Sequence, residues 1–557
     1  MSISMEEWMM RFASFATWVL APVVGFAVVG CASTTSQSAA APVTTAETTL
    51  GVANGVMIDE GVVAFLGLSF AEPPVGDLRF KPPVAIDAWD SPVDASEFGP
   101  ACPQPADSGT GTHYGDQSED CLTLNVWTPS ADDKKRPVMV WVHGGGWIYE
   151  GTEDPLYSGA HLSARGDVVV VSMEYRLGVF GFSHLEGIPG SGNAGLLDQK
   201  LAFEWVRDHI EAFGGDPNNV TLFGESAGGM SATALMAMPS AKGLFHKAIA
   251  QSGAGSTARD PQYAKAVSDK LMTMAGVTSV DELVDLSMQE LRDAQDLLIA
   301  DAFIEDSLFG SVVDGEIFLK GPIQAIADGS AADVPLLTGT TRDETRLWIL
   351  YVDILADISF DAIVAFLPYA ERAIPEGKTV DDVIDLYEST RPGAEPGVIT
   401  HAAGSDIFFR LPAIRLAEAQ LTHQPNNTFL YRFDWPPPAP VLPEEDLGAM
   451  HASELGFMFG SGNEGWLDIY GPDPLPQALT EQMMDAWLAF AKTGDPNHAN
   501  MPNWPAYEAS TRATMMFDTT DAEATSAVAE DPDGEERAFW DGVPFDGITP
   551  TWAPEDL

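Results

Sequence analysis

The sequence predicts an α/β fold in which helices flank a mostly parallel central sheet. One observation is a set of short, nearly continuous apolar runs, which are typical of strands buried on both faces. These runs lie at residues 138–142, 168–172, 220–223, 248–250 and 335–337. A second observation is that residues 196–213, between the second and third of these runs, carry apolar side chains at roughly helical spacing. The resulting β-α-β order favours a parallel sheet.

The composition is strongly acidic. The chain has 557 residues, and its 28 lysines and arginines against 82 aspartates and glutamates give a formal charge of −54. A protein that binds nucleic acid by neutralising phosphates needs a basic face, so the charge excludes that class. Hydrophobic residues make up 45% of the chain, which is enough for a large core and argues against disorder. Such charge also fits adaptation to high salt; the alternative is an acidic surface without that adaptation.

The N-terminal segment predicts export. Residues 12–30 are uncharged and mostly apolar, and they end in a small residue before Cys31. This pattern resembles a bacterial lipoprotein signal, which implies a signal peptide at residues 1–30 and a lipid on the Cys31 thiol. Residues 31–50 are rich in Ser, Thr and Ala and are predicted to be a flexible tether. The alternative is a plain transmembrane anchor, because the apolar run is just long enough to span a bilayer.

Both alternatives place the protein outside the cytoplasm, and the lipoprotein signal predicts a bacterial cell envelope location with Cys31 as the membrane link. Three cysteines are an odd number for an exported chain. If Cys31 carries lipid, Cys102 and Cys121 remain as a pair in an oxidising compartment. The alternative is that these two are free, buried thiols.

The rest of the chain, residues 51–557, is interpreted as a single domain, because the only clear linker precedes it. Residues 262–330 and 354–425 lack strand-like runs and are rich in Ala, Leu and Asp at helical spacing, which predicts helical insertions around the sheet. A late strand is expected at residues 429–433.

A glycine-flanked serine follows the strand at residues 220–223, in the order Gly224-Glu225-Ser226-Ala227-Gly228, and a helix-compatible stretch comes next. A serine on such a sharp turn holds its hydroxyl exposed, because neighbouring glycines let the backbone pass without a Cβ clash. The start of the helix favours developing negative charge. We therefore predict that Ser226 is a nucleophile; the alternative is an ordinary glycine-rich connection.

A glycine loop, His143-Gly144-Gly145-Gly146, follows the strand at residues 138–142. When a serine attacks a carbonyl, hydrogen-bond donors must point at the oxygen on which charge develops. The predicted donors are the N–H groups of Gly145 and Gly146, together with that of Ala227, the residue after the nucleophile. The alternative is a merely flexible loop.

Longer segments carry a family resemblance. Besides residues 223–229, the stretch at 119–127 reads Glu-Asp-Cys-Leu-Thr-Leu-Asn-Val-Trp, and residues 193–199 and 213–217 are also similar to family segments. The sequence thus resembles the type-B carboxylesterases, the cholinesterase-like branch of the α/β-hydrolases, and within them the bacterial para-nitrobenzyl-esterase-like enzymes. The resemblance implies the α/β-hydrolase fold, a Cys102–Cys121 disulfide, and hydrolysis of a small-molecule ester without metal or cofactor.

The resemblance also implies a triad with a glutamate. The segment Thr341-Arg342-Asp343-Glu344 resembles the family's acid motif and points to Glu344, with Asp343 as the nearest rival. Residues 448–455 resemble the histidine loop and point to His451, which follows Ser226 and Glu344 in the hydrolase chain order. In these roles His451 takes the Ser226 proton and returns it to the leaving alcohol, while Glu344 fixes the imidazole tautomer.

The predicted function is that of a serine carboxylesterase acting through an acyl-enzyme, with activity falling below about pH 6.5, where a free histidine is protonated. Glu225, beside the nucleophile, either tunes the imidazolium or is a buried structural carboxylate. The alternative function is that of a catalytically silent, cholinesterase-like binding or adhesion protein, because the family includes such relatives.

Overall fold

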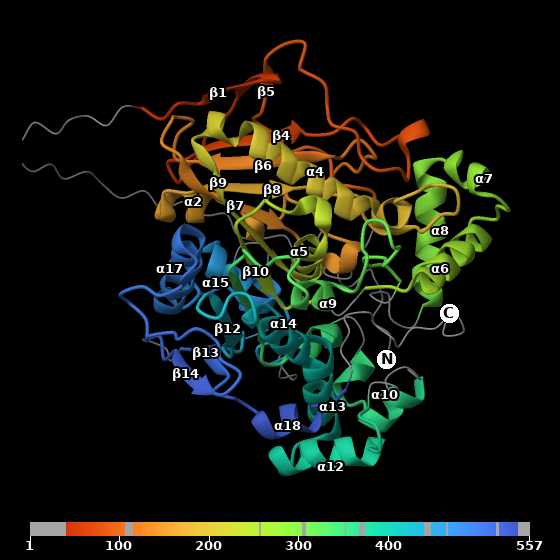
Figure 1. The fold of residues 1–557 in the computed structure, drawn as a ribbon, viewed down its shortest axis with the longest axis vertical. Helices are drawn as coiled ribbons and strands as arrows, with labels where there is room; N and C mark the ends of the chain where they lie inside the picture. The colour runs from red at the N-terminus through yellow and green to blue at the C-terminus, as the bar shows by residue number, and fades with distance from the viewer. Residues whose placement is uncertain are drawn as a thin grey trace, which may run out of the picture. The chain divides into compact units, whose positions relative to one another are not determined.

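An eleven-stranded sheet lies at the centre of the computed structural model (Figure 1). The structure describes residues 41–105, 115–255, 258–302, 308–350, 353–366, 374–438, 447–463, 466–519 and 523–543. The strand order is β14-β13-β12-β11-β10-β9-β7-β8-β6-β4-β3. The strands are β3 (Val56–Met57), β4 (Val63–Ser69), β6 (Thr123–Thr128), β7 (Arg136–Val142), β8 (Val169–Met173), β9 (Gly215–Glu225), β10 (Lys247–Gln251), β11 (Leu336–Thr341), β12 (Thr428–Phe433), β13 (Ala513–Phe517) and β14 (Ala527–Glu530).

The middle of the sheet is parallel and its edges are antiparallel. Strands from β8 through β7, β9, β10, β11 and β12 to β13 run parallel. The pairs β3–β4, β4–β6, β6–β8 and β13–β14 are antiparallel. All the predicted strands are therefore confirmed, and the mostly parallel sheet with them. Because parallel strands end at one edge of the sheet, the segments that follow β7, β9 and β11 gather there.

Burial on both faces explains the continuous apolar runs. In β7, Val140 packs into a core cluster that also holds Phe203 of α4. Its neighbour Trp141 points to the opposite face, into a cluster with Trp487 of α17, and its ring lies 4.9 Å from that of Phe459. Successive side chains of a strand alternate between faces, so a strand covered by helices on both sides needs apolar residues at every position.

Helices cover both faces and form the predicted insertions. In Figure 1, α6 to α8 lie together to the right of the sheet, and α10, α12 and α13 form a second group beyond α14. The helices are α2 (Ala160–Gly166), α3 (Gly178–Phe182), α4 (Ala194–His209), α5 (Ala227–Ala237), α6 (Pro261–Met274), α7 (Val280–Val284), α8 (Met288–Asp301), α9 (Pro322–Ala327), α10 (Phe360–Phe366), α12 (Val380–Thr390), α13 (Pro396–Ser405), α14 (Leu411–Leu421), α15 (Leu455–Phe459), α16 (Leu467–Tyr470), α17 (Gln477–Thr493) and α18 (Gly534–Phe539).

Part of the predicted tether forms a strand. Within the predicted tether at residues 31–50, β1 (Thr45–Thr48) pairs antiparallel with β2 (Gly51–Asn54), and β5 (Val93–Asp94) completes a three-stranded sheet. The prediction is wrong for this part of the tether, because Ala46 is buried and the backbone groups have ladder partners. The β-branched threonines of β1 suit a strand as well as a linker.

The predicted signal peptide at residues 1–30 and the predicted lipidation site Cys31 lie outside the described residues. Among the residues that the structure describes, no helix combines the length and the apolar character needed to cross a membrane.

Candidate active site

The turn between β9 and α5 holds Ser226 in a conformation that side chains rarely adopt, with φ 55° and ψ −124°. The backbone segments around this turn pack so closely that two neighbouring positions, Gly228 and Gly253, have no room for a side chain. A Cβ on Gly228 would lie 2.0 Å from the carbonyl oxygen of Val142, and a Cβ on Gly253 would lie 2.2 Å from that of Ser226. Such strained geometry is typical of functional sites, and here the surrounding glycines permit it.

The glycine loop after β7 lies against this turn. A Cβ on Gly144 would be 3.2 Å from the Cβ of Ser226, so the loop and the serine are in direct proximity. Gly145 and Gly146 adopt φ values of 76° and 61°, which favour glycine. Ala227 is the first residue of α5, so its N–H has no preceding helical turn to bind. Gly144 and Ala227 therefore lie beside Ser226, and the donor roles of Gly145, Gly146 and Ala227 stay a prediction.

His451 and Glu344 form a buried pair, with 4% and 0% of their surfaces exposed. Nδ1 of His451 lies 2.5 Å from Oε2 of Glu344, and the main-chain N–H of His451 donates to the Glu344 carbonyl at 3.2 Å. The other carboxylate oxygen accepts hydrogen bonds from Ser252 Oγ at 2.7 Å and from the N–H of Thr341 at 2.8 Å. With every oxygen engaged, the carboxylate is fixed against Nδ1, which leaves Nε2 as the nitrogen free to exchange a proton.

Asp343, the rival acid, has another place. Its Oδ2 accepts hydrogen bonds from Arg342 Nε at 2.8 Å and from the N–H of Ala449 at 3.0 Å, and its own N–H donates to the Ala449 carbonyl at 2.8 Å. Asp343 thus ties down the loop that carries His451 without touching the imidazole pair. The two adjacent acids have different partners: Glu344 contacts the His451 imidazole and Asp343 contacts the main chain of Ala449. Their positions in the sequence do not reveal this difference.

The structure does not join Ser226 to His451 by a hydrogen bond. Nε2 of His451 lies 3.1 Å from Oε1 of Glu225, and among the described residues neither atom has a hydrogen-bond partner, although both are buried. Apo geometries of catalytic groups are often loose in this way. Burial lowers the pKa of His451, but the negative charges of Glu225 and Glu344 outweigh burial and raise it above the ordinary value.

Two aromatic rings hold the His451 imidazole. The Phe409 ring centroid lies 4.8 Å from that of His451, and the Trp348 centroid lies 5.5 Å from it. Phe409 sits in a π-helical turn, Asp406–Arg410, a local irregularity that is frequent at functional sites. Sequence reasoning missed both rings, because neither belongs to a motif.

Two further acids near the site were also missed. Glu454 is fully buried and accepts hydrogen bonds from Gln251 Nε2 at 3.1 Å and from Tyr431 OH at 3.3 Å. Burial and the nearby charge of Glu344 raise the pKa of Glu454 to about 7. Burial likewise raises the pKa of Glu150, which follows the glycine loop, to about 7. The only available signal was the proximity of each residue to a predicted motif.

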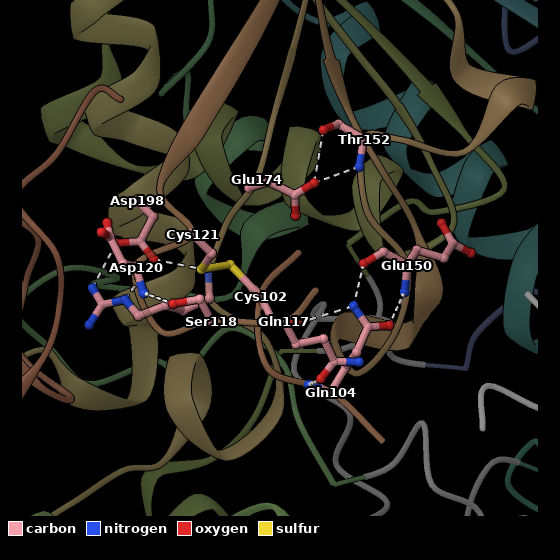
Figure 2. Close-up of a disulfide and its surroundings, with 11 residues drawn as sticks. Cys102, Gln104, Gln117, Ser118, Asp120, Cys121, Glu150, Thr152, Glu174 and Asp198 are labelled. Atoms are coloured by element: carbon pink, nitrogen blue, oxygen red, sulfur yellow. Dashed lines mark hydrogen bonds and ion pairs between the residues drawn. A yellow bond between two sulfur atoms is a disulfide. The ribbon is translucent and has the colours of Figure 1, made fainter. Parts of the chain in front are cut away.

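Cys102 and Cys121 form a disulfide with a Cα–Cα distance of 5.1 Å, which confirms the predicted pair. Figure 2 shows that Gln104, two residues beyond Cys102, lies between this bridge and Glu150. Among the described residues, no group of three or more His, Cys, Asp or Glu side chains is arranged to hold a metal ion.

Comparison with known proteins places the chain in a family. The model of the carboxylesterase family matches residues 42–540. The chain is 41% identical over 493 residues to para-nitrobenzyl esterase of Bacillus subtilis (strain 168), covering 86% of this chain and 95% of the relative. It is 33% identical to phenmedipham hydrolase of Pseudarthrobacter oxydans, over 87% of this chain and 97% of that enzyme.

Solved structures agree. A carboxylesterase from Geobacillus stearothermophilus superposes with a TM-score of 0.79 at 36% identity, covering 89% of this chain and 100% of the other. A para-nitrobenzyl esterase structure has a TM-score of 0.77 at 38% identity, with 89% and 99% covered. The chain has the α/β-hydrolase fold and belongs to the carboxylesterase family of carboxylic ester hydrolases.

Proposed function

We propose that this chain hydrolyses carboxylic esters through an acyl-enzyme formed on Ser226. His451 acts as general base and acid, Glu344 orients it, and the N–H groups of Gly145, Gly146 and Ala227 stabilise the oxyanion. The observation that carries the proposal is the buried contact of 2.5 Å between His451 Nδ1 and Glu344 Oε2, at the sheet edge where the strained Ser226 follows β9.

The chemistry follows from these positions. Nε2 of His451 takes the Ser226 proton as Oγ attacks the ester carbonyl, and the oxyanion is held by the three N–H groups. The protonated imidazole then gives its proton to the leaving alcohol. Water repeats the sequence on the acyl-enzyme, releases the carboxylic acid and restores Ser226. Glu344 keeps the proton on Nδ1 and stabilises the imidazolium in both steps.

The test is the hydrolysis of para-nitrophenyl butyrate by the full chain, with Ser226→Ala run in parallel. We expect the parent to release para-nitrophenol and the variant to retain no more than about a thousandth of that rate. Equal rates would mean that Ser226 is not the nucleophile. A folded parent without activity toward a panel of neutral esters would favour the binding or adhesion function instead.

We also propose that the chain is exported to the bacterial cell envelope and anchored by a lipid on Cys31. The support is the apolar segment before Cys31, together with the pairing of Cys102 and Cys121, which leaves Cys31 as the remaining thiol. Incorporation of labelled palmitate into the parent chain in a bacterial host, and not into Cys31→Ser, is the expected result. Equal labelling of the two would refute the lipid anchor.

A further inference from the structure

We infer that Glu150 is a positioning residue for the oxyanion donors: its carboxyl fixes the glycine loop, while Gln104 fixes the main chain of Glu150. The inference rests on the proposed function, because it concerns the same oxyanion site. It adds to that site a residue that lies outside the predicted triad and outside the predicted donors.

The side chain of Glu150 is folded back onto the glycine loop. Its backbone has φ 78°, a left-handed conformation that a residue with a side chain adopts at a cost. A Cβ on Gly145 would lie only 2.9 Å from the Cγ of Glu150, so the Glu150 stem fills the space beside this donor residue. The loop and the carboxylate are therefore packed as one unit.

Hydrogen bonds hold Gly144 on both sides. Its N–H donates to Oε2 of Glu150 at 3.1 Å, and its carbonyl shares the hydroxyl proton of Tyr175, at 3.2 Å, with the His143 carbonyl at 2.9 Å. The Gly144 carbonyl and the Gly145 N–H belong to one rigid peptide plane. Fixing Gly144 at its N–H and its carbonyl therefore sets the direction of the first predicted oxyanion donor.

The Glu150 carboxyl is itself anchored. The hydroxyl of Tyr157 donates to the same Oε2 at 2.7 Å, and the Tyr157 side chain is buried. A carboxylate oxygen that accepts two hydrogen bonds has little freedom to rotate. The Gly144 N–H is thus linked through Glu150 to a buried residue of η3 (Pro155–Tyr157).

Gln104 anchors the strained main chain. Its Nε2 donates to the Glu150 carbonyl at 2.8 Å, and its Oε1 accepts from the Glu150 N–H at 3.0 Å (Figure 2). Gln104 is 1% exposed and lies two residues from the disulfide-bonded Cys102. This double hydrogen bond holds Glu150 in its unfavourable conformation, so the segment closed by the disulfide contributes to the geometry of the glycine loop.

The experiment compares Glu150→Ala and Glu150→Gln with the parent, using kcat, KM and the affinity for a trifluoromethyl ketone, which forms an oxyanion on the nucleophile. In Glu150→Ala we expect kcat to fall at least about tenfold with KM within about twofold, and ketone affinity to fall in parallel. Glu150→Gln keeps an acceptor oxygen for Gly144 and Tyr157, so it should retain kcat within about threefold. Gln104→Ala should change kcat in the same direction as Glu150→Ala.

The matched control is Glu153→Ala, which removes one carboxylate from the same loop. That carboxylate accepts a hydrogen bond from the N–H of Gly115 and does not contact Gly144. We expect unchanged kcat and ketone affinity in this variant. Melting temperatures are measured for all variants, so that loss of folding is distinguished from loss of positioning.

The inference is overturned if Glu150→Ala is folded and keeps the parent's kcat and ketone affinity. It is also overturned if Glu150→Gln loses as much as Glu150→Ala, because charge and not hydrogen bonding would then be responsible. A parent chain without Ser226-dependent hydrolysis would overturn the proposed function and this inference together. If the parent is active and Glu150→Ala has the same kcat and ketone affinity as the parent, this inference alone is overturned.

Discussion

Nε2 of His451 lies 3.1 Å from Oε1 of Glu225, the residue that immediately precedes Ser226. The nitrogen that must accept the serine proton therefore faces a carboxyl group from the same turn. Burial, together with the charges of Glu454 and Glu150, raises the pKa of Glu225 well above its usual range, while the charge of His451 lowers it. The protonation of Glu225 and the protonation of His451 are therefore coupled, because the charge of each side chain shifts the pKa of the other.

The pH profile should report this coupling. Catalysis requires a neutral His451, and the charges of Glu225 and Glu344 raise its pKa, so activity should fall as the pH drops through a value above the 6.5 of a free imidazole. Glu225→Gln removes one of these charges and should move the acid limb of kcat/KM to lower pH. Rates of a para-nitrophenyl ester between pH 5 and 9 provide the measurement, with Glu153→Gln as the control. A midpoint that stays in place or rises would contradict the coupling.

Glu344 and Asp343 should behave differently when their charges are removed. Glu344→Gln leaves the imidazole without its orienting carboxylate, and we expect kcat to fall by about 10³ to 10⁴-fold, as for other triads that lose this group. Asp343→Asn keeps an acceptor for Ala449 and should lower kcat by less than about tenfold. Steady-state kinetics on both variants test the assignment, which would be reversed if Asp343→Asn were the more damaging change.

The disulfide should stabilise the fold. Cys102 and Cys121 are separated by 19 positions, and a bridge over a loop of this size contributes about 3 kcal/mol on the chain-entropy estimate. Cys121→Ser should lower the free energy of unfolding by about this amount in urea titrations. Adding reductant should lower the stability of the parent but not that of the variant. Equal stability of parent and variant would show that the bridge constrains little.

Glu174 should make the protein less stable at high pH. Burial raises its pKa from 4.5 to about 7, although hydrogen bonds from Thr152 oppose the shift. Because the folded state holds this proton more tightly, its stabilising effect is complete below pH 4.5 and is lost as the pH rises through 7. Glu174→Gln should therefore be more stable than the parent at pH 8, by about 1–3 kcal/mol, and nearly equal at pH 4.5. Urea unfolding at the two pH values tests this, and a variant that is less stable at pH 8 would contradict it.

Anionic esters should be poor substrates at low ionic strength. The formal charge of −54 repels negatively charged ligands over long distances, and salt screens this repulsion. For a pair of esters that differ by one carboxylate, added NaCl should raise kcat/KM for the anionic ester more than for the neutral ester. An identical salt response for both esters would exclude long-range repulsion as a determinant of specificity.

The central strands were predictable because burial on both faces makes β7 to β11 continuous apolar runs. Strands at the edges carry weaker patterns: β3 is exposed at both residues, and Thr45–Thr48 resembles a linker in composition. Their assignment depends on pairing with the next strand along the chain, β4 for β3 and β2 for β1, and composition alone does not show this pairing. Local patterns therefore recover the middle of the sheet and miss its edges.

The residues of the candidate site also differ in how far local sequence patterns predict them. Ser226 and the glycine loop lie in local patterns with a physical meaning, whereas Glu344 and His451, 107 positions apart, were reached only through the family resemblance. Phe409 approaches the site through space alone, whereas Glu150 follows the glycine loop in the sequence and folds back onto it. No spacing rule connects Glu150 to Gly144 or a π-helical turn to an imidazole.

The positive φ of Ser226 has a consequence for the evolution of the protein. Glycine would adopt this backbone without the 1–3 kcal/mol or so that such strain costs a residue with a side chain. If selection acted on folding stability alone, it would therefore favour glycine at position 226. A lineage that no longer needs hydrolysis would gain thermal resistance as it loses its nucleophile, so the serine persists only while its chemistry is under selection.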